Sequence, residues 1–550
     1  MDDMMPPEER VSRLLAIYAA GSVNVAGLLC DRHDRDLTAY TIIAEDLSSH
    51  MLSYGELADE SRALAGALRQ QGIGRGDRVA TLMGKSREFL VVLLAIWRVG
   101  AVHVPLFTAF APPAIAERLA RSSTKLVVVD PQYLGKLDTV AAQQESPALW
   151  VTGKAQPGAR GLREVMTGSA PLVGDVSIEG HEPVIEIFTS GTTGSAKAVT
   201  VPAKALASFQ IYAEYGLGLR SGDRFWNAAD PGWGYGLYFG VLASLITGIA
   251  GHFGQGSFSP ERTWAVLQRF GITNFAAAPT IYRSLMDLAA PVGLTLERCS
   301  SAGEPLTADI NEWSRSALGT LVHDHYGQTE TGMILNNHHH PLLAGEIKHG
   351  SMGRALPGWR MTVLAEDKDV PVAAGEIGRI AADLQESPLA WFEGYVGDER
   401  KSAEKFSADG RWYLTGDVGS MDDDGDFFFS SRVDDVILMA GYRIGPAEVE
   451  AVIARHPAIR SCAVFAVPDR VRGEVLECAV VVRGPVEGDE ALERDIQQWV
   501  KSRYAAHAYP RRVHFFEDLP TTPSGKIQRF RIRQQIIEQM AATDPGETRA

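Results

Sequence analysis

The ten residues from Phe188 to Lys197, with the sequence FTSGTTGSAK, constrain the fold more than any other part of the chain. They continue a short apolar run, Val184–Phe188, that has the composition of a buried strand. Glycines allow a tight turn in which backbone N–H groups approach an anion, and hydroxyls and a lysine add donors. The segment therefore predicts a strand that ends in a phosphate-binding loop. The candidate residues are Thr189, Ser190, Gly191, Thr192, Thr193, Gly194 and Lys197.

Two other interpretations of this segment must be weighed. A Walker A loop has four residues between its first glycine and a Gly-Lys-Ser/Thr triplet. Here Gly191 and Gly194 are three positions apart, and Lys197 is followed by Ala198. A surface turn rich in glycine, serine and threonine would have a similar composition, and for a bare Gly-Thr-Thr-Gly it is the commoner outcome. The choice therefore depends on the rest of the chain.

Helical and strand-like patterns alternate on the N-terminal side of this loop. Apolar residues recur at helical spacing in some segments, and short β-branched runs bounded by glycine or proline lie between them. The expected helices are 57–71 and about 86–99, and the expected strands are 78–83, 101–106 and 126–130. This alternation predicts βα units around a largely parallel sheet.

The chain has 550 residues, which is more than one hydrophobic core normally holds. A boundary is expected near residues 430–435, after an aspartate-rich turn. Beyond it, helices are expected at 446–455 and 491–501, and strands at 464–467, 479–482 and 513–516. We therefore expect an N-terminal domain of residues 1–431, a hinge at 432–435 and a compact α+β domain of residues 436–550.

Composition excludes several classes of protein. A formal net charge of −15 disfavours nonspecific binding to nucleic acid or to anionic membranes. The four cysteines are scattered without a CxxC pair, which fits a reducing compartment. Met1–Arg10 lacks the pattern of a signal peptide, and the most apolar segment, Phe89–Trp97, is too short to cross a bilayer. We therefore expect a cytoplasmic protein with no membrane span and no nucleic-acid partner.

Four further motifs follow the loop in order. They are Ser301-Ala302-Gly303-Glu304-Pro305, Tyr326-Gly327-Gln328-Thr329-Glu330, Tyr413-Leu414-Thr415-Gly416-Asp417 and Pro520–Lys526. Together with the loop they resemble the motifs of the adenylate-forming superfamily, which contains acyl-CoA synthetases, luciferases and peptide-synthetase adenylation domains. The resemblance extends from about Leu52 to Arg533. It implies an α/β fold: a large N-terminal domain of βα layers with a small β-barrel, and a small mobile α+β C-terminal domain.

The resemblance also implies roles for individual residues. Gly303, Glu304 and Pro305 would bind adenine, Tyr326 would stack on it, and Gly327, Gln328 and Thr329 would complete the ATP site. Glu330 would hold Mg²⁺ on the phosphates, which suits a hard cation. Asp417 would accept hydrogen bonds from the ribose hydroxyls, and Arg432 would reach the sugar or a phosphate. Asp434 would be the hinge residue, although the relatives' glycine before the arginine is replaced here by Ser431.

The C-terminal motif implies the catalytic group. Lys526 would bridge the carboxylate and the α-phosphate, two anions that a positioned ammonium can bring together. In the second half-reaction the C-terminal domain would rotate, so that Gly441 and Tyr442 line the thiol tunnel and Arg443 meets the adenylate phosphate. Pro520–Lys526 also resembles the site that protein acetyltransferases modify in such synthetases.

The nature of the acid and of the acceptor follows from departures within the motifs. Acetyl-CoA synthetases carry a tryptophan where this chain has Gly327, so a medium-chain, branched or aromatic acid larger than acetate is expected. Trp233 either lines that acyl pocket or belongs to the core. Phe107 and Thr108 occupy the expected pantetheine contacts, where relatives often have Phe-Gly. Coenzyme A is the favoured acceptor; the alternatives are a separate carrier protein, or a noncatalytic nucleotide-binding protein.

Overall fold

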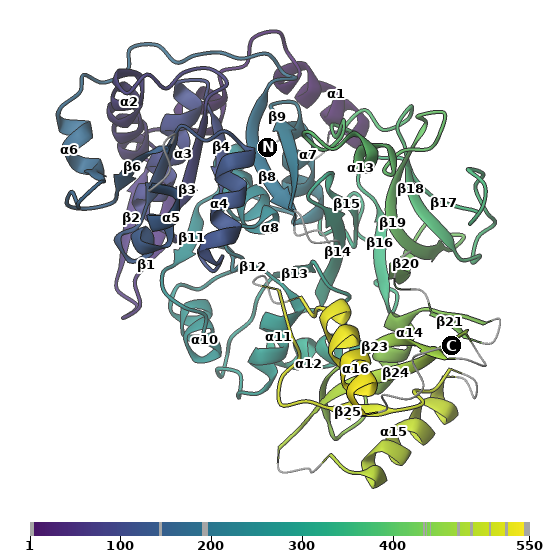
Figure 1. Cartoon of the computed structure of the whole chain (residues 1–550). Helices are drawn as coiled ribbons and strands as arrows, with labels where there is room; N and C mark the ends of the chain where they lie inside the picture. Colours follow the sequence, from purple (N-terminus) through teal and green to yellow (C-terminus); the bar gives the residue numbers. More distant parts are fainter. Residues whose placement is uncertain are drawn as a thin grey trace.

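The computed structural model describes residues 5–141, 146–189, 196–432, 435, 437–439, 442–469, 473–484, 488–504, 508–522 and 526–543. The described strands form sheets of seven, thirteen and five strands (Figure 1). No helix in these ranges is long and apolar enough to cross a membrane.

The seven-stranded sheet has the order β7-β6-β5-β3-β4-β8-β9, and only the β8–β9 pair is antiparallel. Its strands are β3 (Arg78–Leu82), β4 (Val102–Pro105), β5 (Leu126–Val129), β6 (Ala148–Val151), β7 (Arg160–Gly161), β8 (Pro183–Thr189) and β9 (Lys197–Pro202). Helix α2 (Tyr54–Gln70) begins at a capping box formed by Ser53 and Glu56, and α3 (Arg87–Arg98) is buried along most of its length. The βα alternation expected from the sequence is confirmed.

The thirteen-stranded sheet combines parallel and antiparallel parts in the order β17-β18-β19-β20-β16-β15-β14-β13-β12-β10-β11-β1-β2. Strands from β1 to β14 pair in parallel apart from the β1–β2 hairpin, and those from β14 to β20 are antiparallel. The bounds are β1 (Thr38–Ile43), β2 (Ser49–Ser53), β10 (Phe225–Asn227), β11 (Gly251–Gly254), β12 (Asn274–Ala277), β13 (Arg298–Ala302), β14 (Val322–Gln328), β15 (Gly332–Asn336), β16 (Ser351–Ala355), β17 (Met361–Leu364), β18 (Gly378–Asp383), β19 (Trp412–Met421) and β20 (Phe427–Arg432). The strands from β15 to β20 continue this sheet from β14 in antiparallel pairing.

Helices pack around these two sheets (Figure 1). Besides α2 and α3, the α-helices are α1 (Pro7–Tyr18), α4 (Pro112–Arg121), α5 (Asp138–Ala141), α6 (Leu162–Thr167), α7 (Ala205–Ile211), α8 (Gly234–Gly236), α9 (Ala243–Thr247), α10 (Pro260–Arg269), α11 (Pro279–Met286), α12 (Ala308–Ala317) and α13 (Glu399–Ala403). The other helical elements are the 3₁₀ helix η2 (Pro131–Leu137) and the π-helical turns η1 (Gly27–Asp31), η3 (Tyr212–Gly216) and η4 (Leu237–Leu242).

The C-terminal part has its own sheet and core. Its strands are β21 (Ile437–Met439), β22 (Tyr442–Ile444), β23 (Ile459–Asp469), β24 (Gly473–Val482) and β25 (Val513–Phe515), and its helices are α14 (Pro446–Ile453), α15 (Glu490–Arg503) and α16 (Arg529–Thr543). Buried side chains between Ile437 and Ile536 form one apolar cluster that shares no member with the large core of the N-terminal part. An ion pair between Arg529 and Glu450, with nitrogen and oxygen 2.6 Å apart, joins α16 to α14.

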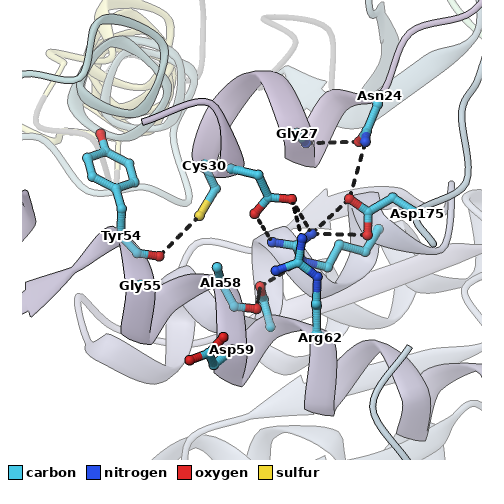
Figure 2. A network of polar contacts seen from close by, with 12 residues as sticks. Asn24, Gly27, Cys30, Tyr54, Gly55, Ala58, Asp59, Arg62 and Asp175 are labelled. Atoms are coloured by element: carbon cyan, nitrogen blue, oxygen red, sulfur yellow. Dashed lines mark hydrogen bonds and ion pairs between the residues drawn. The ribbon is translucent and has the colours of Figure 1, made fainter. Parts of the chain in front are cut away.

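A buried group of charges joins the N-terminal segment to helix α3 (Figure 2). Arg98 at the end of α3 is fully buried, and its guanidinium donates to Asp31 at 2.7 Å and to Asp175 at 2.8 Å. Arg62 adds a second cation to Asp31 at 2.7 Å, and Asn24 donates its side-chain amide to Asp175. Three segments distant in sequence are therefore fixed to one another by paired charges.

Candidate active site

Asp417 is the point at which two of the sequence motifs meet each other and Arg432. It lies on β19, is 4% exposed, and accepts a hydrogen bond from the hydroxyl of Tyr326 on β14. Gln328 at the end of β14 donates its amide to Asp417 Oδ2 at 2.8 Å, and Arg432 at the end of β20 donates to Oδ1 at 2.8 Å. The structure thus brings together four residues that the sequence assigned to nucleotide binding.

Glu330, which follows β14, is 7% exposed. Its Oε1 accepts the hydroxyl of Tyr395 at 2.6 Å, and the Lys197 ammonium lies 5.1 Å from the centre of the Tyr395 ring. Tyr395 also forms an isolated β-bridge with Val199 on β9. Burial, and then the Glu330 carboxylate, raise the pKa of the Tyr395 phenol. Tyr395 therefore connects Glu330 to the strand that follows the phosphate loop.

The predicted phosphate loop is bounded by a hairpin. Thr189 ends β8, Lys197 begins β9, and the two residues are directly paired across the strands. The predicted strand before the loop is confirmed. The remaining candidates, Ser190, Gly191, Thr192, Thr193 and Gly194, lie outside the described residues.

Lys526 reaches this site from the C-terminal part of the chain. Its Nζ lies 5.6 Å from the centre of the Trp233 ring. Gly303, which follows β13 with φ of +100°, leaves room for this approach: a Cβ there would lie 3.1 Å from Trp233 and 3.6 Å from Lys526 Cε. Burial lowers the pKa of Lys526, whereas the carboxylates of Glu304 and Asp417 act in the opposite direction.

The other residues of the adenine motif lie beside Lys526. The Glu304 carboxylate pairs with Arg283 on α11 at 2.7 Å, and Pro305 follows in the loop before α12. Thr329 follows β14, and its hydroxyl lies near the position that a Cβ on Gly234 would occupy. These residues therefore line the carboxyl ends of neighbouring parallel strands, the edge at which α/β sheets bind ligands.

The candidate acyl-pocket residues have clear packing roles. The ring centres of Trp233 and Tyr235 are 5.7 Å apart. A Cβ on Gly327 would lie 2.1 Å from the carbonyl oxygen of Gly332, at an irregular register between β14 and β15. In this chain the backbone of Gly332 thus occupies the space in which a side chain at Gly327 would begin.

The candidate coenzyme A residues fall into two groups. The loop with Phe107 and Thr108 is held by Lys136, whose ammonium donates to the carbonyl oxygens of Thr108 at 2.7 Å and Phe110 at 3.0 Å. Tyr442 and Arg443 lie on β22, opposite Met439 and Leu438 of β21. Gly441 and the hinge residue Asp434 are outside the described residues.

Two site residues were not found from the sequence. Tyr395 belongs to none of the motifs, and neither does Lys405, whose Nζ donates to the carbonyl oxygen of Thr415 at 2.9 Å. Tyr413 belongs to the motif that contains Asp417, and its hydroxyl donates to Gln328 Oε1 at 2.8 Å. The only sequence signal for Lys405 is its place just before the motif that contains Asp417.

Three histidines form a cluster: two lie on β14 and one follows β15. The side-chain nitrogens of His323, His325 and His339 lie within 4.8 Å of one another. The rings of His323 and His339 are stacked at 3.6 Å, so their in-plane lone pairs run parallel and do not converge on one ion. Both nitrogens of His325 contact other groups, Tyr212 and a backbone carbonyl. The neighbouring His338 is also buried, with 5% of its surface exposed.

Comparison with known proteins identifies the family. The AMP-binding enzyme model matches residues 30–394, and the AMP-binding enzyme C-terminal domain model matches residues 448–526. The chain is 34% identical over 494 residues to the mitochondrial acyl-coenzyme A synthetase ACSM3 of Rattus norvegicus, covering 88% of this chain and 84% of the relative. It is 31% identical over 522 residues to the acetyl-coenzyme A synthetase of Bacillus subtilis, with coverages of 92% and 90%.

Solved structures agree with this assignment. The acyl-CoA synthetase of Brucella canis is 36% identical, with a TM-score of 0.75 and 98% of each chain covered. A benzoate CoA ligase from Burkholderia xenovorans is 26% identical, with a TM-score of 0.81 and coverages of 93% and 99%. The chain belongs to the AMP-binding enzyme family of the adenylate-forming superfamily, and its relatives there are acyl-CoA synthetases.

Proposed function

We propose that this chain is an ATP-dependent acyl-CoA synthetase that activates a carboxylic acid larger than acetate. The observation that supports the proposal best is the position of Lys526, which comes from the C-terminal part yet lies against Trp233 and Gly303. An ammonium delivered to the nucleotide motifs suits a reaction that brings a carboxylate to a phosphate. ATP, the acid and coenzyme A are the substrates.

In the first half-reaction a carboxylate oxygen of the acid attacks the α-phosphorus of ATP. The bond to the bridging oxygen breaks, pyrophosphate leaves, and an acyl-AMP forms. Lys526 offsets the repulsion between the two anions, an effect that is strong when the charge is positioned in advance. Asp417 accepts the ribose hydroxyls, while Tyr326 and the segment from Gly303 contact adenine.

Magnesium fits the residues of the site. Glu330 offers a carboxylate whose Oε1 is held by Tyr395, and its Oε2 has no hydrogen-bond donor among the described residues. Hard oxygen ligands of this kind suit Mg²⁺, together with phosphate oxygens. The ion would neutralise charge on the phosphates, and Glu330 would hold it.

In the second half-reaction the thiol sulfur of coenzyme A attacks the acyl carbon, and AMP leaves. Phe107 and Thr108 would contact the pantetheine arm, and Gly441, Tyr442 and Arg443 would reach the site after rotation of the C-terminal domain. This assigns residues 1–431 and 436–550 to two domains, with a hinge at 432–435 that includes Asp434. The separate apolar cluster between Ile437 and Ile536 supports this division.

The acid is proposed to be medium-chain, branched or aromatic, bound beside Trp233 and Gly327, which would place the enzyme in fatty-acid metabolism. The test is pyrophosphate release with ATP and Mg²⁺ across acids from acetate to decanoate, with branched and aromatic members, with and without coenzyme A. Turnover that requires coenzyme A and peaks beyond acetate is expected. Maximal activity on acetate would contradict the pocket, and acyl-AMP that coenzyme A does not discharge would indicate a carrier protein.

We also propose a cytoplasmic location and control by a protein acetyltransferase acting on Lys526. Acetylation would remove the charge that adenylation needs. A preparation acetylated at Lys526 should form acyl-AMP far more slowly than the unmodified protein. An undiminished rate would contradict this form of control.

A further inference from the structure

Lys405 is held against the strand that carries Asp417. It follows helix α13, and its carbonyl oxygen accepts the N–H of Leu414 on β19 at 2.8 Å. The neighbouring residue Phe406 forms an isolated β-bridge with Tyr413. This pairing orients the Lys405 side chain along β19, with Nζ 5.4 Å from the centre of the Tyr413 ring.

The ammonium of Lys405 uses only part of its capacity to donate. An ammonium carries three N–H groups, and among the described residues Nζ makes one hydrogen bond, to the carbonyl oxygen of Thr415 at 2.9 Å. The Gln328 amide donates to the same oxygen at 2.9 Å, so this carbonyl is shared. No carboxylate in the described part of the chain lies within ion-pair distance of Lys405.

The charges around Lys405 are those of the nucleotide site. Burial lowers the pKa of its ammonium, the carboxylates of Glu330 and Asp417 raise it, and the cations Arg432 and Lys197 lower it further. The Lys405 ammonium is thus influenced by both the carboxylate assigned to the ribose and the carboxylate assigned to the phosphates. A partly buried cation with open donors and no ion-pair partner is suited to an incoming anion.

We propose that Lys405 binds the phosphate chain of the nucleotide, on the side of Glu330. The proposal rests on the function proposed above, because that function supplies ATP as the ligand. The geometry favours a phosphate over the acid's carboxylate, since the described contacts of Lys405 are with the nucleotide motifs, whereas Trp233 lies against Lys526. Lys405 is then a substrate-binding residue that no sequence motif contains.

The test measures binding of ATP, AMP and adenosine to the full chain by calorimetry, without acid or coenzyme A. Lys405→Met removes the charge, and Lys405→Gln is a second variant in case the first fails to fold. The control is Lys401→Met, because Lys401 lies on the same segment but pairs with Glu404 at 2.8 Å. Adenosine lacks phosphates, so its affinity also reports whether the site of each variant is intact.

The variants at Lys405 should bind ATP about 10- to 100-fold more weakly, the effect expected for a lost hydrogen bond to a charged group. Adenosine affinity should stay unchanged in them, and Lys401→Met should bind all three ligands like the wild type. An equal loss for adenosine and ATP, or undiminished ATP affinity, would overturn the proposal. Failure of the wild type to release pyrophosphate with any acid would instead refute the proposed function. The affinities of the variants for ATP and adenosine could still be compared with those of the wild type.

Discussion

Two buried groups of charges in this molecule differ in how fully their members are paired. Around Arg98, each guanidinium nitrogen donates, Nε to Ser61 and the other two to Asp31 and Asp175. In the proposed nucleotide site, Lys526 Nζ has no hydrogen-bond acceptor among the described residues, and Lys405 Nζ has one, the carbonyl oxygen of Thr415. The first group is saturated by the protein itself, whereas the second retains open donors.

This difference predicts that the first group stabilises the fold and that the second group binds a ligand. A buried charge whose hydrogen bonds are all made within the protein fixes segments to one another. Its removal destabilises the fold, because its charged partners are then left buried without a counter-charge. A buried charge with open donors contributes less to the fold but is available to a ligand. Substitutions in the Arg98 group should therefore change stability and leave substrate binding intact, and substitutions in the site should do the reverse.

Breaking the saturated group should give the largest effect. Arg98→Met leaves Asp31 and Asp175 without their main partner, and we expect the free energy of unfolding to fall by about 3–5 kcal/mol. Urea denaturation measures the loss. The matched control is Arg87→Met, at the other end of α3, whose ion pairs with Glu56 and Glu60 are more exposed and should contribute at most about 1 kcal/mol. Equal losses in both variants would mean that the fully paired Arg98 contributes no more to stability than an exposed ion pair.

Removing the open charge at Lys526 should reduce catalysis and not stability. Lys526→Ala is expected to slow acyl-AMP formation by about 10²–10³-fold, the range seen when one positioned electrostatic group is deleted. Transfer to coenzyme A from preformed acyl-AMP should be affected far less. The control is Lys501→Ala, which removes another ammonium that lies over an aromatic ring, Tyr509, at 3.8 Å. Comparable losses in both half-reactions would contradict the role assigned to Lys526.

Tyr395 tests whether the site depends on its supporting hydrogen bonds. Tyr395→Phe removes the hydroxyl that donates to Glu330. We expect the KM for ATP and for Mg²⁺ to rise about tenfold, with a smaller change in kcat. Tyr504→Phe is the matched control, since Tyr504 also donates to a glutamate, Glu448, but on an exposed face. Unchanged KM values in Tyr395→Phe would show that Glu330 is held without this hydroxyl.

The sequence predicted the site where its residues form contiguous motifs. Asp417, Glu330 and Lys526 could each be found because a short string with a recognisable order surrounds them. Tyr395 and Lys405 could not, because their positions depend on isolated bridges, Val199 with Tyr395 and Phe406 with Tyr413, that no local pattern encodes. Pairing between distant strands therefore limits what can be predicted from motifs.

The fold shows the same limit. The βα units were predictable because helix and strand periods alternate over short stretches. The antiparallel strands from β14 to β20 continue the parallel sheet, and this junction was not expected. It depends on the β14–β15 hairpin, where Gly327 lets two backbones approach closely, a requirement that only the three-dimensional register reveals.

The smallest expected effect is on the free energy of unfolding at acid pH. Burial by itself would raise the pKa of Asp31, but hydrogen bonds and charge from Arg98, with Arg62, hold it below the ordinary value of 3.8. A carboxyl with a depressed pKa in the folded state stabilises the fold above its ordinary pKa, and this contribution is lost as the pH falls through the folded pKa. Unfolding free energy should therefore decline more steeply below about pH 4 in the wild type than in Asp31→Asn.

Urea denaturation between pH 3 and pH 6 measures both curves, and the difference between them isolates Asp31 from other acidic groups. A parallel decline would mean that Asp31 has the same pKa in the folded and unfolded states, so that its pairing with Arg98 adds no pH-dependent stability. The proposed nucleotide site offers the contrast: Asp417→Asn should weaken ATP binding at neutral pH, because Asp417 is the carboxylate proposed to accept the ribose hydroxyls. If Asp417→Asn left ATP affinity unchanged, the division between saturated and open charges would fail.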